Sequence, residues 1–343
     1  MSKTPVPEVY KTRARSLALL PLMIAVLFVY KANTSMKVLS STWATGTMAG
    51  RPNMVAFGEQ VTAFSAVQRL ENYLLAIWPA LVFGILIAAA VRAFVSPFLI
   101  VRFLGKRLLP SQIRAGFAGA PLMLCSCCVA PVFTTVAETS ARLAPAIGFM
   151  LASPSLNPAA LALTFMLFEP RIAVLRALLA ISAVLVIGPV TERAVARRQS
   201  PVLLSTTREE SSEENAVVPF FRALRVVTIR TLPVVLIGVF VSMLIVQFVP
   251  PAIFQSAGAN VVVVVIIATI AVPLALPTFL EIPIALSLLA AGFSSGAAVA
   301  FLFAGPAVNL PSLWSVAQVS GWRVAVTVAV SVWAIAVLGG LIG

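Results

Sequence analysis

Nine apolar runs divide the chain, and most are about as long as the hydrocarbon core of a lipid bilayer is thick, since a helix needs about 20 apolar residues to cross that core. With 60% hydrophobic and 10% charged residues and a mean hydropathy of +1.05, the chain holds more apolar surface than a soluble domain of 343 residues can bury. We therefore predict an all-α polytopic membrane protein that lies in the lipid bilayer. The runs cover residues 16–30, 73–91, 113–137, 143–168, 172–190, 231–249, 261–291, 296–319 and 324–342.

The charged residues lie mainly in the gaps between these runs. Lysine and arginine number 24 against 11 acidic residues, which gives a formal charge of +13. In a soluble domain this charge would indicate nucleic acid, but basic gaps are what the positive-inside rule expects of a membrane protein. We therefore predict no nucleic-acid partner. The chain has no histidine and no aspartate, which excludes a histidine base and histidine-rich metal sites. We also expect no cofactor and no enzymatic activity. No P-loop is present, so ATP would have to act through another chain.

Polar stretches divide the chain into five parts. The first apolar run is predicted to be an anchor helix; a cleaved signal peptide is the alternative, but Phe28, Val29 and Tyr30 are too bulky for a small-x-small cleavage site. The charged linker between the two membrane parts has no apolar periodicity, so we expect it to be flexible. The parts are 1–32 (cytoplasmic tail and anchor helix), 33–72 (polar loop), 73–192 (membrane repeat 1), 193–219 (charged cytoplasmic linker) and 220–343 (membrane repeat 2).

The last eight runs form an internal repeat of four plus four. At a constant offset of 152 residues, the halves share prolines and an asparagine, which seldom match by chance in apolar sequence: Pro121 with Pro273, Pro131 with Pro283, Pro154 with Pro306 and Asn157 with Asn309. We expect the six prolines to break helices, which is tolerated at membrane depth only where the backbone faces protein or a wet cavity. Paired, interrupted segments in two halves point to a transporter binding site.

The distribution of charge predicts that the two repeats are inverted. The gap 92–114 of the first half has five basic residues and no acidic one, so it should be cytoplasmic, whereas the matching gap 250–260 has no charge. The stretch 191–230 is basic as well, although three runs separate it from the gap 92–114. We therefore expect one proline-broken run in each half to be a re-entrant hairpin. The alternative has every run spanning the membrane, with parallel repeats and the linker outside.

All three cysteines lie within four residues: Cys125, Cys127 and Cys128. Thiolate is a soft donor that suits Cu(I), zinc or thiophilic metalloids. In a helical turn Cys125 and Cys128 would share a face, and in an extended chain Cys125 and Cys127 would; either arrangement gives a dithiol. The alternative is that buried free cysteines act as small hydrophobic residues. We predict reduced thiols that bind substrate, a soft metal or a metalloid.

Glu281 is the only charged residue between Arg230 and Arg323, and it lies in the repeat partner of the cysteine segment. An unpaired acidic side chain at the bilayer centre costs about 2.5 to 3.5 kcal/mol, so Glu281 must be protonated, paired or exposed to a wet cavity. We predict that it carries the coupling proton; the alternative is a hydrogen-bonded structural carboxyl group. Glu138 is predicted to pair with Arg142 at the membrane interface.

Small polar side chains accompany the broken runs in both halves. We predict that these side chains bind substrate. The two asparagines could also cap the broken half-helices, either in place of binding substrate or in addition to it. The small polar residues are Ser126, Ser153, Asn157, Thr278 and Asn309.

The segment 125–128 (Cys-Ser-Cys-Cys), with the segment 152–158 (Ala-Ser-Pro-Ser-Leu-Asn-Pro) and its echo at 304–309, resembles the predicted permease family that includes the ArsP organoarsenical exporters. The resemblance covers residues 73–342. The family is typified by Cys-Ser-Cys-Gly before a proline, and Cys128 stands here in the place of the glycine. The resemblance implies efflux of trivalent organoarsenicals such as methylarsenite, with Cys125 and Cys127 as the matching thiols.

Together these observations predict a multi-pass inner-membrane permease that exports a thiophilic small molecule or metalloid by secondary active, proton-coupled transport. Two alternatives remain. The same fold could export copper, zinc or a small anion. A membrane thiol oxidoreductase could use the Cys-x-x-Cys spacing of Cys125 and Cys128, although no second cysteine cluster is present to relay electrons.

Overall fold

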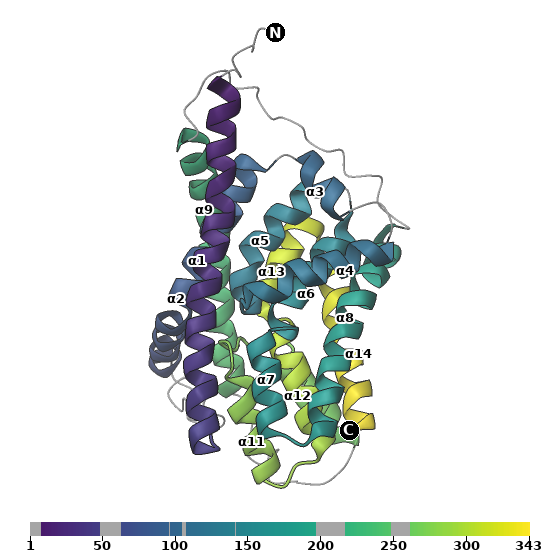
Figure 1. Cartoon of the computed structure of the whole chain (residues 1–343). Coiled ribbons are helices and arrows are strands. Elements are labelled where there is room, and N and C mark those ends of the chain that lie inside the picture. The colour runs from purple at the N-terminus through teal and green to yellow at the C-terminus, as the bar shows by residue number, and fades with distance from the viewer. Residues whose placement is uncertain are drawn as a thin grey trace.

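The structure, a computed structural model of the whole chain, describes residues 8–48, 63–95, 97–104, 108–140, 142–196, 217–247 and 261–343. Every regular element in these ranges is a helix (Figure 1). The chain is therefore an all-helical membrane protein, as its apolar runs predict. Most of the predicted linker, 193–219, and part of the predicted loop, 33–72, lie outside the described residues.

Five long helices each contain a stretch that is long and apolar enough to cross a membrane. Two bent pairs of shorter helices raise the number of candidate spans to seven if each pair is one span. The long helices are α1 (Glu8–Thr45), α2 (Ala63–Phe94), α8 (Pro170–Ala196), α9 (Val217–Gln247) and α14 (Trp322–Ile342).

Helix α1 is longer than the sequence predicts and lies on the outside of the bundle (Figure 1). It continues to Thr45, through residues assigned above to the polar loop. Hydroxyl groups of its polar residues donate hydrogen bonds to carbonyls of the preceding turn, from Thr34 to Tyr30 (2.9 Å) and from Thr45 to Ser41 (2.8 Å), so these groups are satisfied within the helix. Only 11% of its apolar span is buried, against 50% in α2, so α1 adds little to the core.

Short helices fill the centre of the molecule. In α6 and α12 every residue after the first is buried, which is typical of helices that are apolar on all sides. Both end in a bend: α6 meets α7 at 43° and α12 meets α13 at 49°. The short elements are α3 (Pro97–Leu104), α4 (Leu108–Gly119), η1 (Ala120–Leu122), α5 (Ser126–Thr139), α6 (Leu143–Ser155), α7 (Pro158–Leu167), α10 (Val261–Ala271), α11 (Glu281–Ala290), α12 (Ser295–Ala307) and α13 (Leu310–Ser320).

The two bent pairs run in opposite directions. In Figure 1, α6 lies near the middle of the molecule and leads down into α7, whereas α12 lies in the lower half and leads up into α13. Helix α5 lies in the upper half and α11 in the lower half. This course is the one that inverted repeats with re-entrant segments require. The repeat itself stays a prediction.

Two apolar runs, 113–137 and 261–291, are interrupted, as their prolines predict: each contains helices separated by an unwound stretch. The first stretch, residues 123–125, joins η1 to α5, and the second, residues 272–280, joins α10 to α11. Each contains a non-glycine residue with positive φ, Met123 (50°) and Phe279 (77°). Such backbone persists only where the surrounding structure holds it. Side chains from neighbouring helices do so here, because Ser153 accepts a hydrogen bond from the Leu124 amide (3.2 Å) and Ser242 accepts one from the Ala275 amide (2.6 Å).

Ion pairs join the helix ends at one side of the molecule. Glu138 at the end of α5 contacts Arg92 of α2 (2.5 Å) and Arg230 of α9 (3.0 Å), and Arg142 before α6 contacts Glu192 of α8 (2.9 Å). The predicted pair of Glu138 with Arg142 is therefore wrong. The two residues lie near each other in sequence, but Glu138 pairs with arginines of α2 and α9, and Arg142 pairs with a glutamate of α8. All five side chains are partly exposed, so each pair adds at most about 1 kcal/mol.

Candidate functional site

A small cavity lies where the unwound stretches and the bent helices meet. Its volume of about 10 Å³ has room for roughly one water molecule, so this conformation is closed around the site. First-turn or capping residues of α5, α7 and α11 (Ser126, Asn157 and Glu281) face the cavity, so three helix N-termini, which favour negative charge, point towards it. The complete lining is Leu124, Cys125, Ser126, Pro154, Asn157, Leu276, Pro277, Thr278, Glu281 and Pro306.

The three cysteines form one cluster at the start of α5. Cys125 is the N-cap residue, and its carbonyl accepts hydrogen bonds from the amides of Cys128 and Val129 (both 3.0 Å), so the backbone folds the cysteines into a single turn. The Sγ atom of Cys125 lies 3.2 Å from that of Cys127 and 2.7 Å from that of Cys128, and Cys127 and Cys128 are 3.8 Å apart. All three are free thiols. Both sequence-predicted dithiols are thus present together.

Helix α2 holds this cluster in place. The hydroxyl group of the fully buried Tyr73 lies 3.2 Å from Cys127 Sγ, within hydrogen-bond distance. Further along α2, Gly84 packs directly on the Cys128 carbonyl, and a Cβ atom at this position would lie 2.3 Å from that oxygen. Glycine is therefore required for α2 and α5 to approach this closely. Only Cys125 reaches the cavity; Cys127 and Cys128 lie behind it, with 0% exposure.

Glu281 forms a buried ion pair with Arg176. The Arg176 Nη2 atom on α8 lies 2.9 Å from Glu281 Oε1, and the two side chains are 1% and 3% exposed. The same guanidinium donates a hydrogen bond to the hydroxyl group of Thr164 on α7. Of the three states that the sequence allows for Glu281, the structure therefore shows the paired one. The pair joins α8 of the first half to the start of α11 in the second half.

The predicted polar residues divide into two groups. Ser126, Asn157 and Thr278 line the cavity, whereas Ser153 is fully buried and holds the backbone of Leu124. Both asparagines cap helices: Asn157 Oδ1 accepts from the amides of Ala159 and Ala160, and Asn309 forms a capping box with Ser312. Asn309 lies outside the cavity lining, and its Nδ2 atom is buried without a hydrogen-bond partner.

Two of the six prolines do not break a helix. Pro131 lies inside α5, which continues to Thr139, so its ring removes only the hydrogen bond to the Cys127 carbonyl. Pro283 is the third residue of α11, where the amide would have no helical partner in any case. The other four mark interruptions: Pro121 lies in η1, Pro273 follows α10, and Pro154 and Pro306 lie in the last turns of α6 and α12.

Sequence reasoning missed Arg176 and Tyr73. Arg176 was overlooked inside the apolar run 172–190, where it is the only charged residue, and an isolated charge at membrane depth is itself a signal of function. Tyr73 gives no such signal, because an aromatic residue at the start of an apolar run is typical of a membrane interface. Its contact with Cys127, 54 residues away, comes only from the fold.

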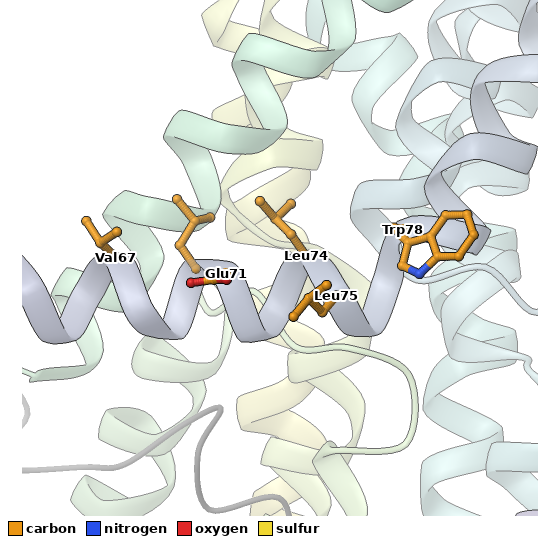
Figure 2. A pocket seen from close by; sticks show the side chains of 6 residues that line it. Val67, Glu71, Leu74, Leu75 and Trp78 are labelled. Carbon is orange, nitrogen blue, oxygen red and sulfur yellow. The ribbon is translucent and has the colours of Figure 1, made fainter.

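A larger hollow of about 310 Å³ lies on the surface of α2 (Figure 2). Its lining is Val67, Leu70, Glu71, Leu74, Leu75 and Trp78, all from this one helix. Several of these side chains are strongly exposed, Leu75 at 65% and Trp78 at 58%. A shallow apolar groove on one helix suits lipid contact, and we place the candidate site at the cavity between the halves.

The fold and the site define a class of protein: a multi-pass membrane protein whose broken helices enclose a buried, polar and thiol-containing site, as in transporters. The chain belongs to the predicted permease family ArsP_1, which it matches over residues 63–343. It is a membrane permease.

Curated relatives of this chain come from bacteria and an archaeon. UPF0718 protein YraQ of Escherichia coli is 27% identical, over 70% of each chain. UPF0718 protein MJ0584 of Methanocaldococcus jannaschii is 22% identical, over 72% of this chain and 86% of its own. UPF0718 protein YcgR of Bacillus subtilis is 27% identical over 37% of this chain and 46% of its own. No solved structure matches the chain.

Proposed function

We propose that this permease exports a thiophilic substrate, a trivalent arsenical such as methylarsenite, from the cytoplasm across the inner membrane. The observation that carries the proposal is the cluster of three buried thiols beside the cavity between the halves. Trivalent arsenic exchanges hydroxide for thiolate, and the first turn of α5 favours the negative charge of the bound sulfurs. Cys125 faces the cavity and is the first ligand, and Cys127 is the second.

Glu281 supplies the coupling. A proton that binds to Glu281 removes the negative charge that holds Arg176, and the 2.9 Å link between α8 and α11 is then lost. Because these helices belong to different halves, breaking the link frees the halves to move against each other. Uptake of a proton from outside would thus open a cavity that is closed in the paired state.

Soft metal ions are the second candidate substrate. The three cysteines are the one group of three or more metal-ligating side chains within the described ranges. Thiolates select Cu(I) and zinc among biological metal ions. A panel of substrates therefore includes both ions.

The test is uptake into everted vesicles with an imposed pH gradient, using methylarsenite, Cu(I) and zinc as probes. The wild type should accumulate methylarsenite, and the double variant Cys125→Ser, Cys127→Ser should lose accumulation while keeping its level in the membrane. Uptake that persists unchanged in the double variant would overturn the thiol role. Accumulation of a metal ion in place of methylarsenite would show that the substrate is that ion.

A further inference from the structure

The positions of the three sulfur atoms fit a centre that is bonded to all of them at once. They form a triangle with sides of 2.7, 3.2 and 3.8 Å. A point at a metal–sulfur bond length of about 2.3 Å from each sulfur lies about 1.2 Å out of their plane. The triangle is too small for a planar three-coordinate centre at that bond length. The geometry is therefore a pyramid with the bound atom at its apex.

A trivalent metalloid matches this pyramid better than the metal ions do. Arsenic(III) and antimony(III) make three bonds on one side and keep a lone pair on the other, so three sulfurs complete their coordination. Zinc takes four ligands in a tetrahedron, and the described residues bring only three metal-ligating groups together here. The charge differs too. Three thiolates on a trivalent centre are neutral, whereas zinc leaves one negative charge and Cu(I) leaves two, which is costly at membrane depth.

The third thiol, Cys128, sets the preference of the site between inorganic and methylated arsenicals. Methylarsenite has two exchangeable hydroxides and one carbon–arsenic bond that thiols do not displace. Methylarsenite can therefore bind only two sulfurs, and the third thiol would stay unbound. The methyl group on arsenic would then need the space that the third sulfur fills. Cys128 lies 2.7 Å from Cys125 and is 0% exposed, so little space is left there for a methyl group.

We propose that Cys125, Cys127 and Cys128 together form a three-thiol site for a trivalent metalloid hydroxide with three exchangeable positions, arsenite or antimonite. The inference rests on the proposed function and ranks its substrates: arsenite and antimonite, held by three sulfurs, bind more tightly than methylarsenite, which the site holds by two. Binding is a ligand exchange without oxidation or reduction: three metalloid–oxygen bonds break, three metalloid–sulfur bonds form, and each thiol proton leaves with a hydroxide as water. Cys125 makes the first bond because it alone faces the cavity.

The test uses the purified full-length chain loaded in turn with arsenite, antimonite and methylarsenite. X-ray absorption spectroscopy counts the sulfur ligands, and equilibrium binding gives the affinities. We expect three sulfurs and no oxygen on arsenic from arsenite, and two sulfurs and one carbon on arsenic from methylarsenite. Arsenite that retains an oxygen ligand in the wild type would overturn the proposal. Antimonite loading shows whether the same three sulfurs accept the larger metalloid.

Variants of single cysteines separate this inference from the proposed function. Cys128→Ala should lower arsenite affinity by about 100-fold or more, because the third bond is intramolecular once two have formed. It should not lower methylarsenite affinity, because the methyl group gains the space that the Cys128 sulfur fills. Cys127→Ala is the matched control and should weaken both. Cys128→Ser, which preserves the size of the side chain, serves if the alanine variant does not fold. Equal arsenite affinity in the wild type and a folded Cys128 variant overturns the inference alone; loss of binding of all arsenicals in the wild type overturns the proposed function as well.

Discussion

The two sides of the central cavity are built alike but carry opposite chemistry. In each half an unwound stretch leads into a short helix whose first turn faces the cavity, α5 on one side and α11 on the other. The first side, the thiol half-site, carries Cys125, Cys127 and Cys128. The second, the ion-pair half-site, carries Glu281, which is held by Arg176. An unwound stretch and a short helix thus present soft ligands on one side of the cavity and a titratable ion pair on the other.

The contacts of the two half-sites differ in range. The thiols contact one another and Tyr73, all within the first half of the chain. Glu281 instead contacts a residue of the first half, 105 positions away. A cluster within one half can bind a substrate whatever the relative position of the two halves. A contact between the halves, in contrast, is made or broken when the halves move. We therefore propose that the first half-site binds the substrate and that the second couples transport to protons.

The largest effect on stability is expected from breaking the ion pair. Arg176→Ala leaves Glu281 buried and uncompensated, which should lower the free energy of unfolding by about 3 to 5 kcal/mol. Thermal unfolding in detergent measures the change. The double variant Arg176→Met, Glu281→Gln removes both charges and should recover most of the loss. An Arg176→Ala protein as stable as the wild type would show that the pair is not formed.

A smaller effect is expected at the thiol half-site. In Gly84→Ala the new methyl group meets the Cys128 carbonyl, so α2 and the first turn of α5 must move apart. Overpacking of this kind costs about 1 to 3 kcal/mol, and it should also weaken arsenical binding. Gly116→Ala on α4 is the control, because its methyl group would meet Val184 at an ordinary 3.4 Å. Equal binding by the two variants would refute the role of this contact.

The smallest effects are expected at the two helix caps. Asn157→Ala and Asn309→Ala each remove a capping side chain and should each lower stability by about 1 kcal/mol. The variants should differ in transport, because Asn157 lines the cavity and Asn309 does not. Melting temperature and vesicle uptake measured on both variants test this. Equal loss of transport in the two would show that capping alone explains both asparagines.

Much of the fold could be predicted from the sequence because it depends on local pattern. The apolar runs indicate a helical membrane protein, and the prolines Pro121, Pro154, Pro273 and Pro306 mark four of the interruptions. The two asparagines are predicted to cap half-helices or to bind substrate, and the structure shows both as the caps of α7 and α13. The excess length of α1 could not be predicted from hydropathy, since residues 33–45 are mostly polar.

Partners far apart in the chain could not be predicted in this way. The sequence placed three thiols within four residues, but it gave no sign that Tyr73 closes the cluster or that only Cys125 reaches the cavity. Glu281 and Arg176 each stand out as an isolated charge in an apolar run, but nothing in the sequence indicates that the two form a pair. These contacts follow from how the halves pack together, which periodicity and spacing do not describe.

The most direct test of the division between the half-sites measures arsenical binding and pH-driven uptake side by side. Three proteins are compared: the wild type, Cys125→Ser and Glu281→Gln. Cys125→Ser should lose binding and uptake together. Glu281→Gln should bind the arsenical as the wild type does, while its uptake no longer responds to the pH gradient. Loss of binding in Glu281→Gln, or a wild-type response of its uptake to the gradient, would contradict the account.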